Sequence, residues 1–121
     1  MSTQRQALGQ WGESRAVEYL QSLGYTILGR NVRTRFGELD MVARRAGVTV
    51  FVEVKTRSGS SYGPPEASVT PAKLAHIYTS AQAYLLAHPE LEGDWRVDVI
   101  AIQRRGVNQL PEIVHFENAL A

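Results

Sequence analysis

The stretch Val48-Thr-Val-Phe-Val-Glu-Val-Lys-Thr56 says most about the fold of this chain. Valine and phenylalanine at this density favour a β-strand, and apolar side chains on both of its faces place that strand in the interior of a sheet. Side chains alternate along a strand, so Phe51, Glu53 and Lys55 are expected on one face. A carboxylate and an ammonium group on a central strand lose hydration unless each has a partner. Glu53 and Lys55 therefore need a compensating group nearby.

The residues before this strand predict an antiparallel partner for it. Glu38–Arg44 is expected to be a strand, and the turn-sized segment Arg45–Gly47 joins the two into a hairpin. A further strand is expected from Tyr25 to Leu28, running into a basic segment where Asn31 marks a bulge or bend. Upstream, apolar residues at helical spacing from Leu8 to Leu23 predict a helix that ends at Gly24.

Downstream, the residues predict one helix and two more strands. Ser58–Pro65 is rich in Gly, Ser and Pro and is expected to be a loop. Thr70-Pro71 supplies an N-cap and a first-turn proline for a helix that ends before Pro89. Trp95–Gln103 and Glu112–Phe116 are expected to be strands. The order α-β-β-β-α-β-β predicts an α/β protein with a mixed central sheet flanked by helices.

Length and composition limit the classes of protein to consider. At 121 residues and 44% hydrophobic content, we expect one domain over residues 1–121, with residues 1–7 flexible. Because no stretch approaches the roughly 20 apolar residues that span a bilayer and no secretion signal is evident, we expect a cytoplasmic protein that does not enter the membrane. The absence of cysteine excludes disulfides and thiolate metal sites. The three histidines, His76, His88 and His115, are isolated, without Asp or Cys at ligand spacing, so none is interpreted as catalytic.

Charge is concentrated in the middle of the chain. Residues 30–57 hold seven basic side chains against three acidic ones, a local excess of +4 in a chain whose net charge is +1. This excess indicates a phosphate-facing surface. The alternative is a pair of solvated strands whose arginines keep the sheet edges soluble.

The residues Asp40, Glu53 and Lys55 suggest metal-dependent chemistry. Twelve residues separate the two acids, which is enough for two strand arms and a tight turn, so the two carboxylates can face each other across the hairpin. Two close carboxylates repel unless a cation lies between them, and magnesium prefers a few carboxylates with waters and substrate phosphates. Phosphodiester hydrolysis suits such a site. The alternative is a same-face ion pair of Glu53 and Lys55, with Asp40 capping a turn.

Several motifs together resemble a known family. They are Gly12-Glu13, Gly37-Glu-Leu-Asp40, Phe51-Val-Glu-Val-Lys-Thr-Arg57, Tyr62-Gly63 and Lys73. In combination they resemble the YraN-type family of small bacterial proteins, which is similar to Holliday-junction resolvases of the restriction-endonuclease-like, PD-(D/E)XK superfamily. The resemblance runs from about Gly9 to Asp98 and implies a restriction-endonuclease-like core.

The resemblance also implies roles for particular residues. Asp40 matches the superfamily aspartate, Glu53 the second carboxylate and Lys55 the lysine, while the backbone carbonyl of Val54 would join the two acids as a metal ligand. Glu13 matches a helix acid that approaches the same metal in resolvase-like relatives. The metal would be Mg²⁺ or Mn²⁺. The sequence departs from the superfamily name at Leu39, where the name has proline.

The expected substrate is DNA, branched DNA included. The residues expected to contact nucleic acid are Arg33, Arg35, Arg57, Tyr62 and Lys73. A lysine in a first helical turn can also be simply solvated, so both readings of Lys73 stay open. Because a branched junction presents two symmetric cuts, a homodimer fits this substrate. The competing hypothesis is a non-catalytic module that binds nucleic acid or protein on a nuclease scaffold.

Overall fold

Two helices and five strands make up the protein, in the order the sequence predicts. The computed structural model describes residues 3–59 and 69–120. The elements are α1 (Gln4–Ser22), β1 (Thr26–Thr34), β2 (Gly37–Arg45), β3 (Val48–Ser58), α2 (Pro71–Ala87), β4 (Trp95–Arg104) and β5 (Glu112–Phe116). The predicted loop Ser58–Pro65 falls largely outside the described residues.

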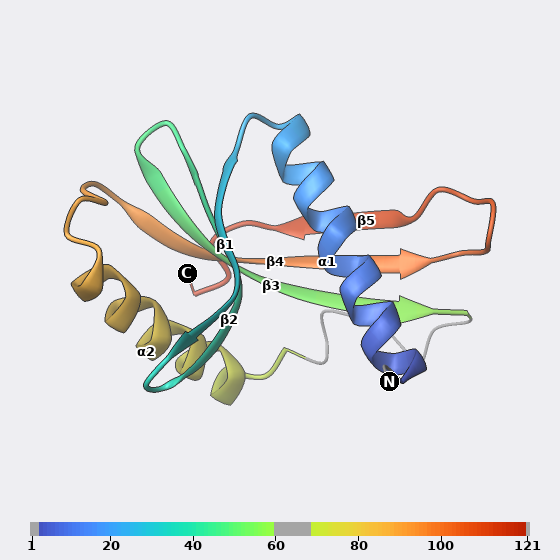
Figure 1. Ribbon diagram of the computed structural model, residues 1–121, viewed down its shortest axis with the longest axis horizontal. Coiled ribbons are helices and arrows are strands. Elements are labelled where there is room, and N and C mark those ends of the chain that lie inside the picture. Colours follow the sequence, from blue (N-terminus) through green and yellow to red (C-terminus); the bar gives the residue numbers. More distant parts are fainter. Residues whose placement is uncertain (1–2, 60–68, 121) are drawn as a thin grey trace.

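The strands form one mixed sheet in the order β1-β2-β3-β4-β5 (Figure 1). Neighbouring strands are antiparallel except β3 and β4, which are parallel. A parallel pair needs a long crossover, and α2 lies in the connection between these two strands. The predicted α/β class with a mixed sheet and flanking helices is therefore confirmed.

Each helix covers one face of the sheet and closes one apolar core. The core under α1 contains Leu20, Met41, Val50 and Val52, and the core under α2 contains Val42, Phe51, Ile77 and Tyr84. Alternation along β3 is thus as predicted, since the even-numbered valines face α1 and Phe51 faces α2.

The first helix begins earlier than the sequence predicts. The hydroxyl of Thr3 accepts a hydrogen bond from the backbone N–H of Gln6, and the side chain of Gln6 accepts one from the N–H of Thr3. This reciprocal capping box starts α1 at Gln4. Residues 4–7, which we expected to be flexible, therefore form the first turn of the helix.

The second helix begins as predicted. The hydroxyl of Thr70 accepts a hydrogen bond from the N–H of Lys73, and Pro71 occupies the first helical position. Neither helix in the described part of the chain is long and apolar enough to span a membrane.

The strands β2 and β3 separate at Asp40, while β1 stays paired with β2 on both sides of it. Pairing between β2 and β3 extends only to Met41 and Val52, one residue short of Asp40. On the other side of β2, Asn31 lies opposite Asp40 and has a left-handed backbone with φ of 51°. Asparagine tolerates this conformation better than most residues. Of the bulge or bend predicted at Asn31, only the left-handed backbone is observed, because the register shift of β1 lies between Ile27 and Gly29. The fork at Asp40 lies between β2 and β3.

Candidate functional site

Asp40 and Glu53 lie together at this fork. Glu53 carries a carboxylate, yet on the central strand β3 it is only 4% exposed. The Asp40 Oδ2 atom accepts a hydrogen bond from the backbone N–H of Val54 at 3.0 Å. The side chain of Asp40 thus occupies the space where the β2 backbone would otherwise pair with β3. The expected approach of the two acids across the hairpin is observed.

Burial and charge both disfavour ionisation of Asp40. Loss of hydration raises the pKa of Asp40 from 3.8 to about 6, and the negative charge of Glu53 contributes in the same direction. A side-chain hydrogen bond to Glu53 also favours the protonated form. The Val54 N–H and the charge of Lys73 oppose these effects and keep the pKa from rising further. Any cation that bound between the two acids would relieve the strongest repulsion in the site.

Both lysines of the chain contact Glu53. The sequence contains eleven arginines but only two lysines, Lys55 and Lys73. The Nζ atom of Lys55 lies 3.7 Å from Glu53 Oε1, and that of Lys73 lies 3.5 Å from the same oxygen. Each ammonium group remains partly exposed, with 30% and 45% of the side chain accessible. The cations therefore face solvent on one side and the buried carboxylate on the other.

The position of Lys73 follows from the start of α2. The cap at Thr70 fixes the first turn of the helix, and Lys73 lies in that turn. The side chain then reaches Glu53 across the face of β3. The reading of Lys73 as merely solvated is wrong, because its ammonium group forms an ion pair with a buried acid.

The donor set fits a hard divalent cation with open coordination positions. Among residues 3–59 and 69–120, no third acid or histidine joins Asp40 and Glu53. The N–H and C=O of one strand residue point to the same side, so the carbonyl of Val54 faces the fork together with its N–H. Two carboxylates and one carbonyl would leave positions for water and phosphate oxygens, as magnesium prefers.

The structure does not bring Glu13 into this cluster. Its Oε1 atom accepts a hydrogen bond from the Asn31 side chain at 3.1 Å and lies 3.7 Å from Arg30. Gly12, the residue before Glu13, lets α1 approach the sheet closely, because any Cβ at this position would lie 1.9 Å from Thr56 Oγ1. Glu13 thus contacts the strand next to Asp40 through Asn31, without a recorded contact to Asp40 itself.

The remaining predicted nucleic-acid residues are scattered. Arg33 and Arg35 lie at the β1–β2 end, where both line a hollow of about 290 Å³ against the last turns of α2. Arg57 lies on β3 two residues beyond Lys55. Tyr62 lies outside the described residues. Lys73 contacts the acid pair through Glu53.

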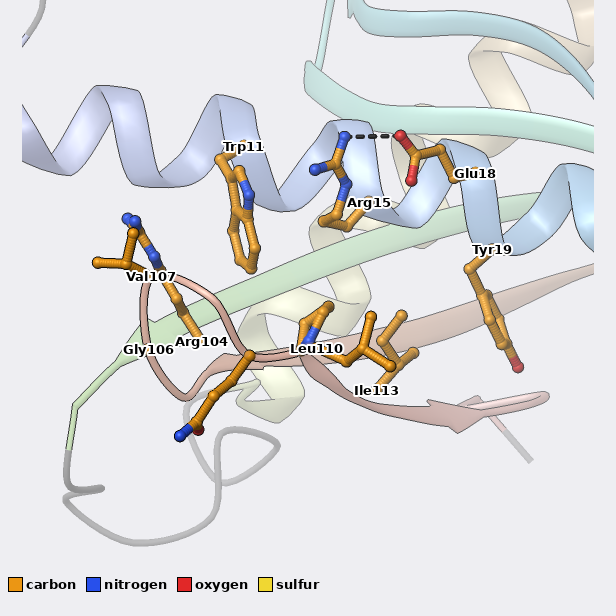
Figure 2. A pocket seen from close by; sticks show the side chains of 11 residues that line it. Trp11, Arg15, Glu18, Tyr19, Arg104, Gly106, Val107, Leu110 and Ile113 are labelled. Atoms are coloured by element: carbon orange, nitrogen blue, oxygen red, sulfur yellow. Dashed lines mark hydrogen bonds and ion pairs between the residues drawn. The ribbon is translucent and has the colours of Figure 1, made fainter.

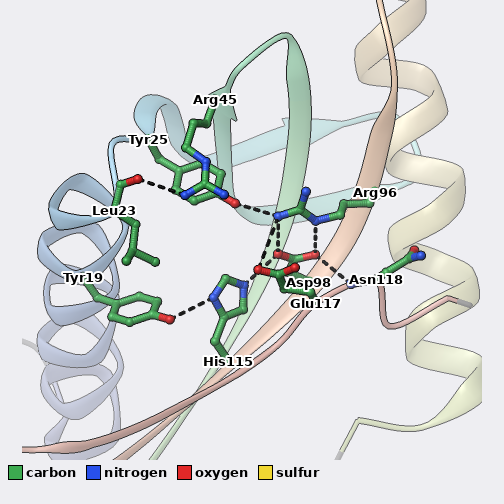
Figure 3. A network of polar contacts seen from close by, with 9 residues as sticks. All are labelled: Tyr19, Leu23, Tyr25, Arg45, Arg96, Asp98, His115, Glu117 and Asn118. Atoms are coloured by element: carbon green, nitrogen blue, oxygen red, sulfur yellow. Dashed lines mark hydrogen bonds and ion pairs between the residues drawn. The ribbon is translucent and has the colours of Figure 1, made fainter.

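A second polar cluster is buried around Asp98 of β4, whose partner on β3 is Val52, the residue before Glu53 (Figure 3). Asp98 is fully buried and accepts hydrogen bonds from Arg96 at 3.0 Å and from the backbone N–H of Asn118 at 3.0 Å. Its other oxygen lies 2.7 Å from His115 Nε2, and His115 Nδ1 lies 3.0 Å from the Tyr19 hydroxyl. The prediction that His115 is isolated is therefore wrong, because its ring contacts both Asp98 and Tyr19.

Hydrogen bonding keeps Asp98 ionised. Burial by itself would raise the pKa of Asp98, but hydrogen bonds from His115, Arg96 and Asn118 outweigh it and hold the pKa below its usual value of 3.8. Sequence reasoning missed this cluster because its members come from α1, β4 and the β5 region. The spacing of Arg96 and Asp98, which places both on one face of β4, is the local signal that could have found it.

Fold and site together define an α/β protein whose mixed sheet carries a buried Glu53, a half-buried Asp40 and two lysines at the fork between β2 and β3. Residues 12–102 match the family described as "Uncharacterised protein family UPF0102". The chain belongs to this family.

Bacterial relatives named "UPF0102 protein" match nearly the whole chain. The relative from Syntrophotalea carbinolica is 47% identical over 119 residues, covering 98% of this chain and 95% of its own length. The relative from Geobacter metallireducens is 46% identical over 119 residues, covering 98% and 96%. The relative from Desulforamulus reducens is 43% identical over 122 residues, covering 99% and 100%.

Proposed function

We propose that this protein is a Mg²⁺- or Mn²⁺-dependent endonuclease with a restriction-endonuclease-like core that hydrolyses DNA phosphodiesters. The observation that carries the proposal is the convergence of Asp40, Glu53 and both lysines of the chain on one point of the sheet. Each of these groups has a distinct task in phosphodiester hydrolysis.

The acids would hold the metal. Asp40 and Glu53, with the carbonyl of Val54, would bind the cation through oxygen atoms. When bound, the cation polarises a phosphoryl oxygen and lowers the pKa of a bound water. Binding also removes the repulsion that now raises the pKa of Asp40.

The lysines would act on the phosphate. Lys55 lies on the same strand face as Glu53, so its ammonium group can orient the attacking water or stabilise negative charge in the transition state. Lys73 approaches from α2 and, being more exposed, is suited to hold a neighbouring phosphate oxygen of the DNA.

Branched DNA is included in the proposed substrate class, and its two symmetric cuts favour a two-fold homodimer. Arg33, Arg35 and Arg57 would contact the DNA backbone outside the site. Such an enzyme would act in the cytoplasm, where its DNA substrate is. Sedimentation equilibrium with and without a four-way junction tests the dimer.

A second candidate is a non-catalytic module that binds nucleic acid or protein. The observation that favours it is that Lys55 and Lys73 already neutralise Glu53, so the cluster is satisfied without metal. In that case the acid pair would serve stability and the surface arginines would bind the partner.

Cleavage assays separate the two candidates. Purified protein is incubated with plasmid, single-stranded and four-way-junction DNA in Mg²⁺ or Mn²⁺, beside Glu53→Ala and Lys55→Ala. The proposal predicts metal-dependent cleavage of at least one substrate by the wild type alone. If every substrate stays intact while DNA binding persists in all three proteins, the binding module is the correct reading.

A further inference from the structure

A hollow on the α1 side of the sheet combines an aromatic ring with two guanidinium groups (Figure 2). Its volume is about 560 Å³, and it lies between α1 and the connection from β4 to β5. Trp11 projects from α1 into this space. The guanidinium carbon of Arg104 lies 5.5 Å from the Trp11 ring centroid, and that of Arg15 lies 5.8 Å from it.

The polar groups of the hollow are incompletely used. Within residues 3–59 and 69–120, the recorded partner of Arg104 is the Trp11 ring, and no carboxylate neutralises it. Arg15 forms an ion pair with Glu18 at 2.6 Å, but its Nε atom is buried without a hydrogen-bond partner. Buried N–H donors are normally satisfied, so an unpaired one indicates a missing acceptor.

The rim of the hollow is apolar and exposed. Val107 and Leu110, on the β4–β5 connection, are 86% and 90% exposed. Within the described residues, these exposed apolar side chains lie next to an aromatic ring and to Arg104, which no carboxylate neutralises, and this combination matches a ligand with flat apolar faces and negative charges. Unpaired nucleotides have both, because each base offers a stacking face and each phosphate a charge.

The hollow is connected to the proposed nuclease site through β3 and β4. Arg104 pairs in register with Ser58, three residues beyond Lys55, which is a distance of about 10 Å along the strand. Trp11 is next to Gly12, whose backbone lies against Thr56 of β3. Glu53 contacts Lys73 of α2 and the hollow lies against α1, so the two sites lie on opposite faces of the same strands.

We infer that this hollow binds a single-stranded segment of the DNA substrate, an inference that rests on the proposed function. A base stacks on the ring of Trp11. The guanidinium groups of Arg104 and Arg15 donate hydrogen bonds to the phosphates that flank this base, and Val107 and Leu110 cover its apolar surface. Duplex DNA keeps its bases inside the stack and cannot fill the hollow in this way. Junctions and frayed ends, which offer unpaired bases, would therefore be preferred.

The test is fluorescence anisotropy with a labelled twelve-nucleotide oligothymidine and a labelled duplex of twelve base pairs, in EDTA so that no cleavage occurs. Trp11→Leu and Arg104→Gln are expected to weaken oligothymidine binding about fivefold or more, as loss of a stacked base or a phosphate contact does elsewhere. Duplex binding should change less than about twofold by the same reasoning.

Two matched variants control for charge and packing. Arg105→Gln removes one positive charge from the next position, where the arginine is paired with Glu112 instead of the Trp11 ring. Trp11→Phe keeps an aromatic face in the hollow. Both should bind oligothymidine within about twofold of the wild type, because neither removes the stacking site. Arg104 is half-buried at the end of β4, so Arg104→Gln tests the proposal even if Trp11→Leu fails to fold.

Each outcome decides the inference independently of the nuclease proposal. Oligothymidine binding that depends on Trp11 and Arg104 supports the inference even if no substrate is cleaved. Equal losses for Arg104→Gln and Arg105→Gln would show a general charge effect and overturn the inference. Unchanged oligothymidine binding in both hollow variants would also overturn it, even if metal-dependent cleavage remains.

Discussion

The Asp40 carboxylate accepts the backbone N–H of Val54, with 3.0 Å between Oδ2 and nitrogen, at the point where β2 leaves β3. This one contact fixes the acid of β2 beside Glu53 of β3 and orients the Val54 carbonyl toward the same space. Because the Asp40 side chain, and not the β2 backbone, accepts the Val54 N–H, β2 and β3 stay apart at this fork. The site therefore depends on a local interruption of the sheet.

Asp40→Asn should stabilise the metal-free protein at neutral and alkaline pH. The folded-state pKa of Asp40 is raised from 3.8 to about 6, so its protonation contributes stability that is complete below about pH 3.8 and is lost as the pH rises through about 6. Asparagine keeps an oxygen that accepts the Val54 N–H, and it stays uncharged at every pH, so it avoids the unfavourable ionisation of Asp40. We expect a gain of about 1–3 kcal/mol at pH 8 that disappears near pH 4, measured by urea unfolding in EDTA.

Glu38→Gln is the matched control, because Glu38 is an exposed acid on the same strand. Its free energy of unfolding should follow the wild type from pH 4 to pH 8. An Asp40→Asn protein that is less stable than the wild type at pH 8 would contradict the electrostatic account of the site.

Loss of either lysine should impair cleavage more than folding. Both ammonium groups face solvent as well as Glu53, so Lys55→Met and Lys73→Met should cost only about 1 kcal/mol of stability. Loss of a positioned donor to transition-state charge should lower single-turnover cleavage about a hundredfold for Lys55→Met. Lys73→Arg keeps the charge and should recover part of the Lys73→Met defect. Wild-type rates in both methionine variants would remove the lysines from the mechanism.

Gly12→Ala should destabilise the protein strongly. The new Cβ would lie 1.9 Å from Thr56 Oγ1 and 2.8 Å from Thr56 Cβ, so α1 would have to move away from β3. We expect a loss of about 2 kcal/mol or more by thermal or urea unfolding. Gly9→Ala is the control on the same helix, since nothing lies within 4 Å of its Cβ position, and its gain in helix propensity should make it neutral or stabilising by up to about 1 kcal/mol. Equal stability of the two variants would refute the close approach.

Asp98→Asn should lose stability in a pH-dependent manner. The pKa of Asp98 is held below 3.8, so its ionised form contributes stability above that pH, and the contribution is lost as the pH falls through the folded-state value. Near pH 7 the variant should lose about 3–5 kcal/mol, because Arg96 and His115 would lose their buried anion. Asp94→Asn, at an exposed position directly before β4, should change little. A loss that is the same at pH 3 and pH 7 would argue against an ionised Asp98.

Local patterns were sufficient to predict most of the fold. The alternation around Glu53 gave the faces of β3, the short turn at Arg45–Gly47 gave the hairpin, and Thr70-Pro71 gave the start of α2. Each is a short-range effect of side-chain alternation, turn length or capping. The early start of α1 was missed because the capping residues Thr3 and Gln6 precede the apolar pattern.

The residues of the site could be predicted to lie together only where they share a strand or a hairpin. Asp40 and Glu53 are related by a tight hairpin, and Lys55 by alternation on one strand. The pairing of Lys73 with Glu53 crosses a connection between elements, and no spacing in the sequence indicates it. The contact of His115 with Tyr19 spans 96 residues, so the sequence offers no local sign of it.

Calorimetric titration of Mn²⁺ into wild type, Asp40→Asn, Glu53→Gln and Glu38→Gln at pH 7.5 tests the proposed acid pair most directly. The account predicts one ion bound per chain by the wild type and by Glu38→Gln, with affinity at least about tenfold weaker in the other two variants. Absence of binding by the wild type, or equal binding by all four proteins, would contradict a metal site at Asp40 and Glu53.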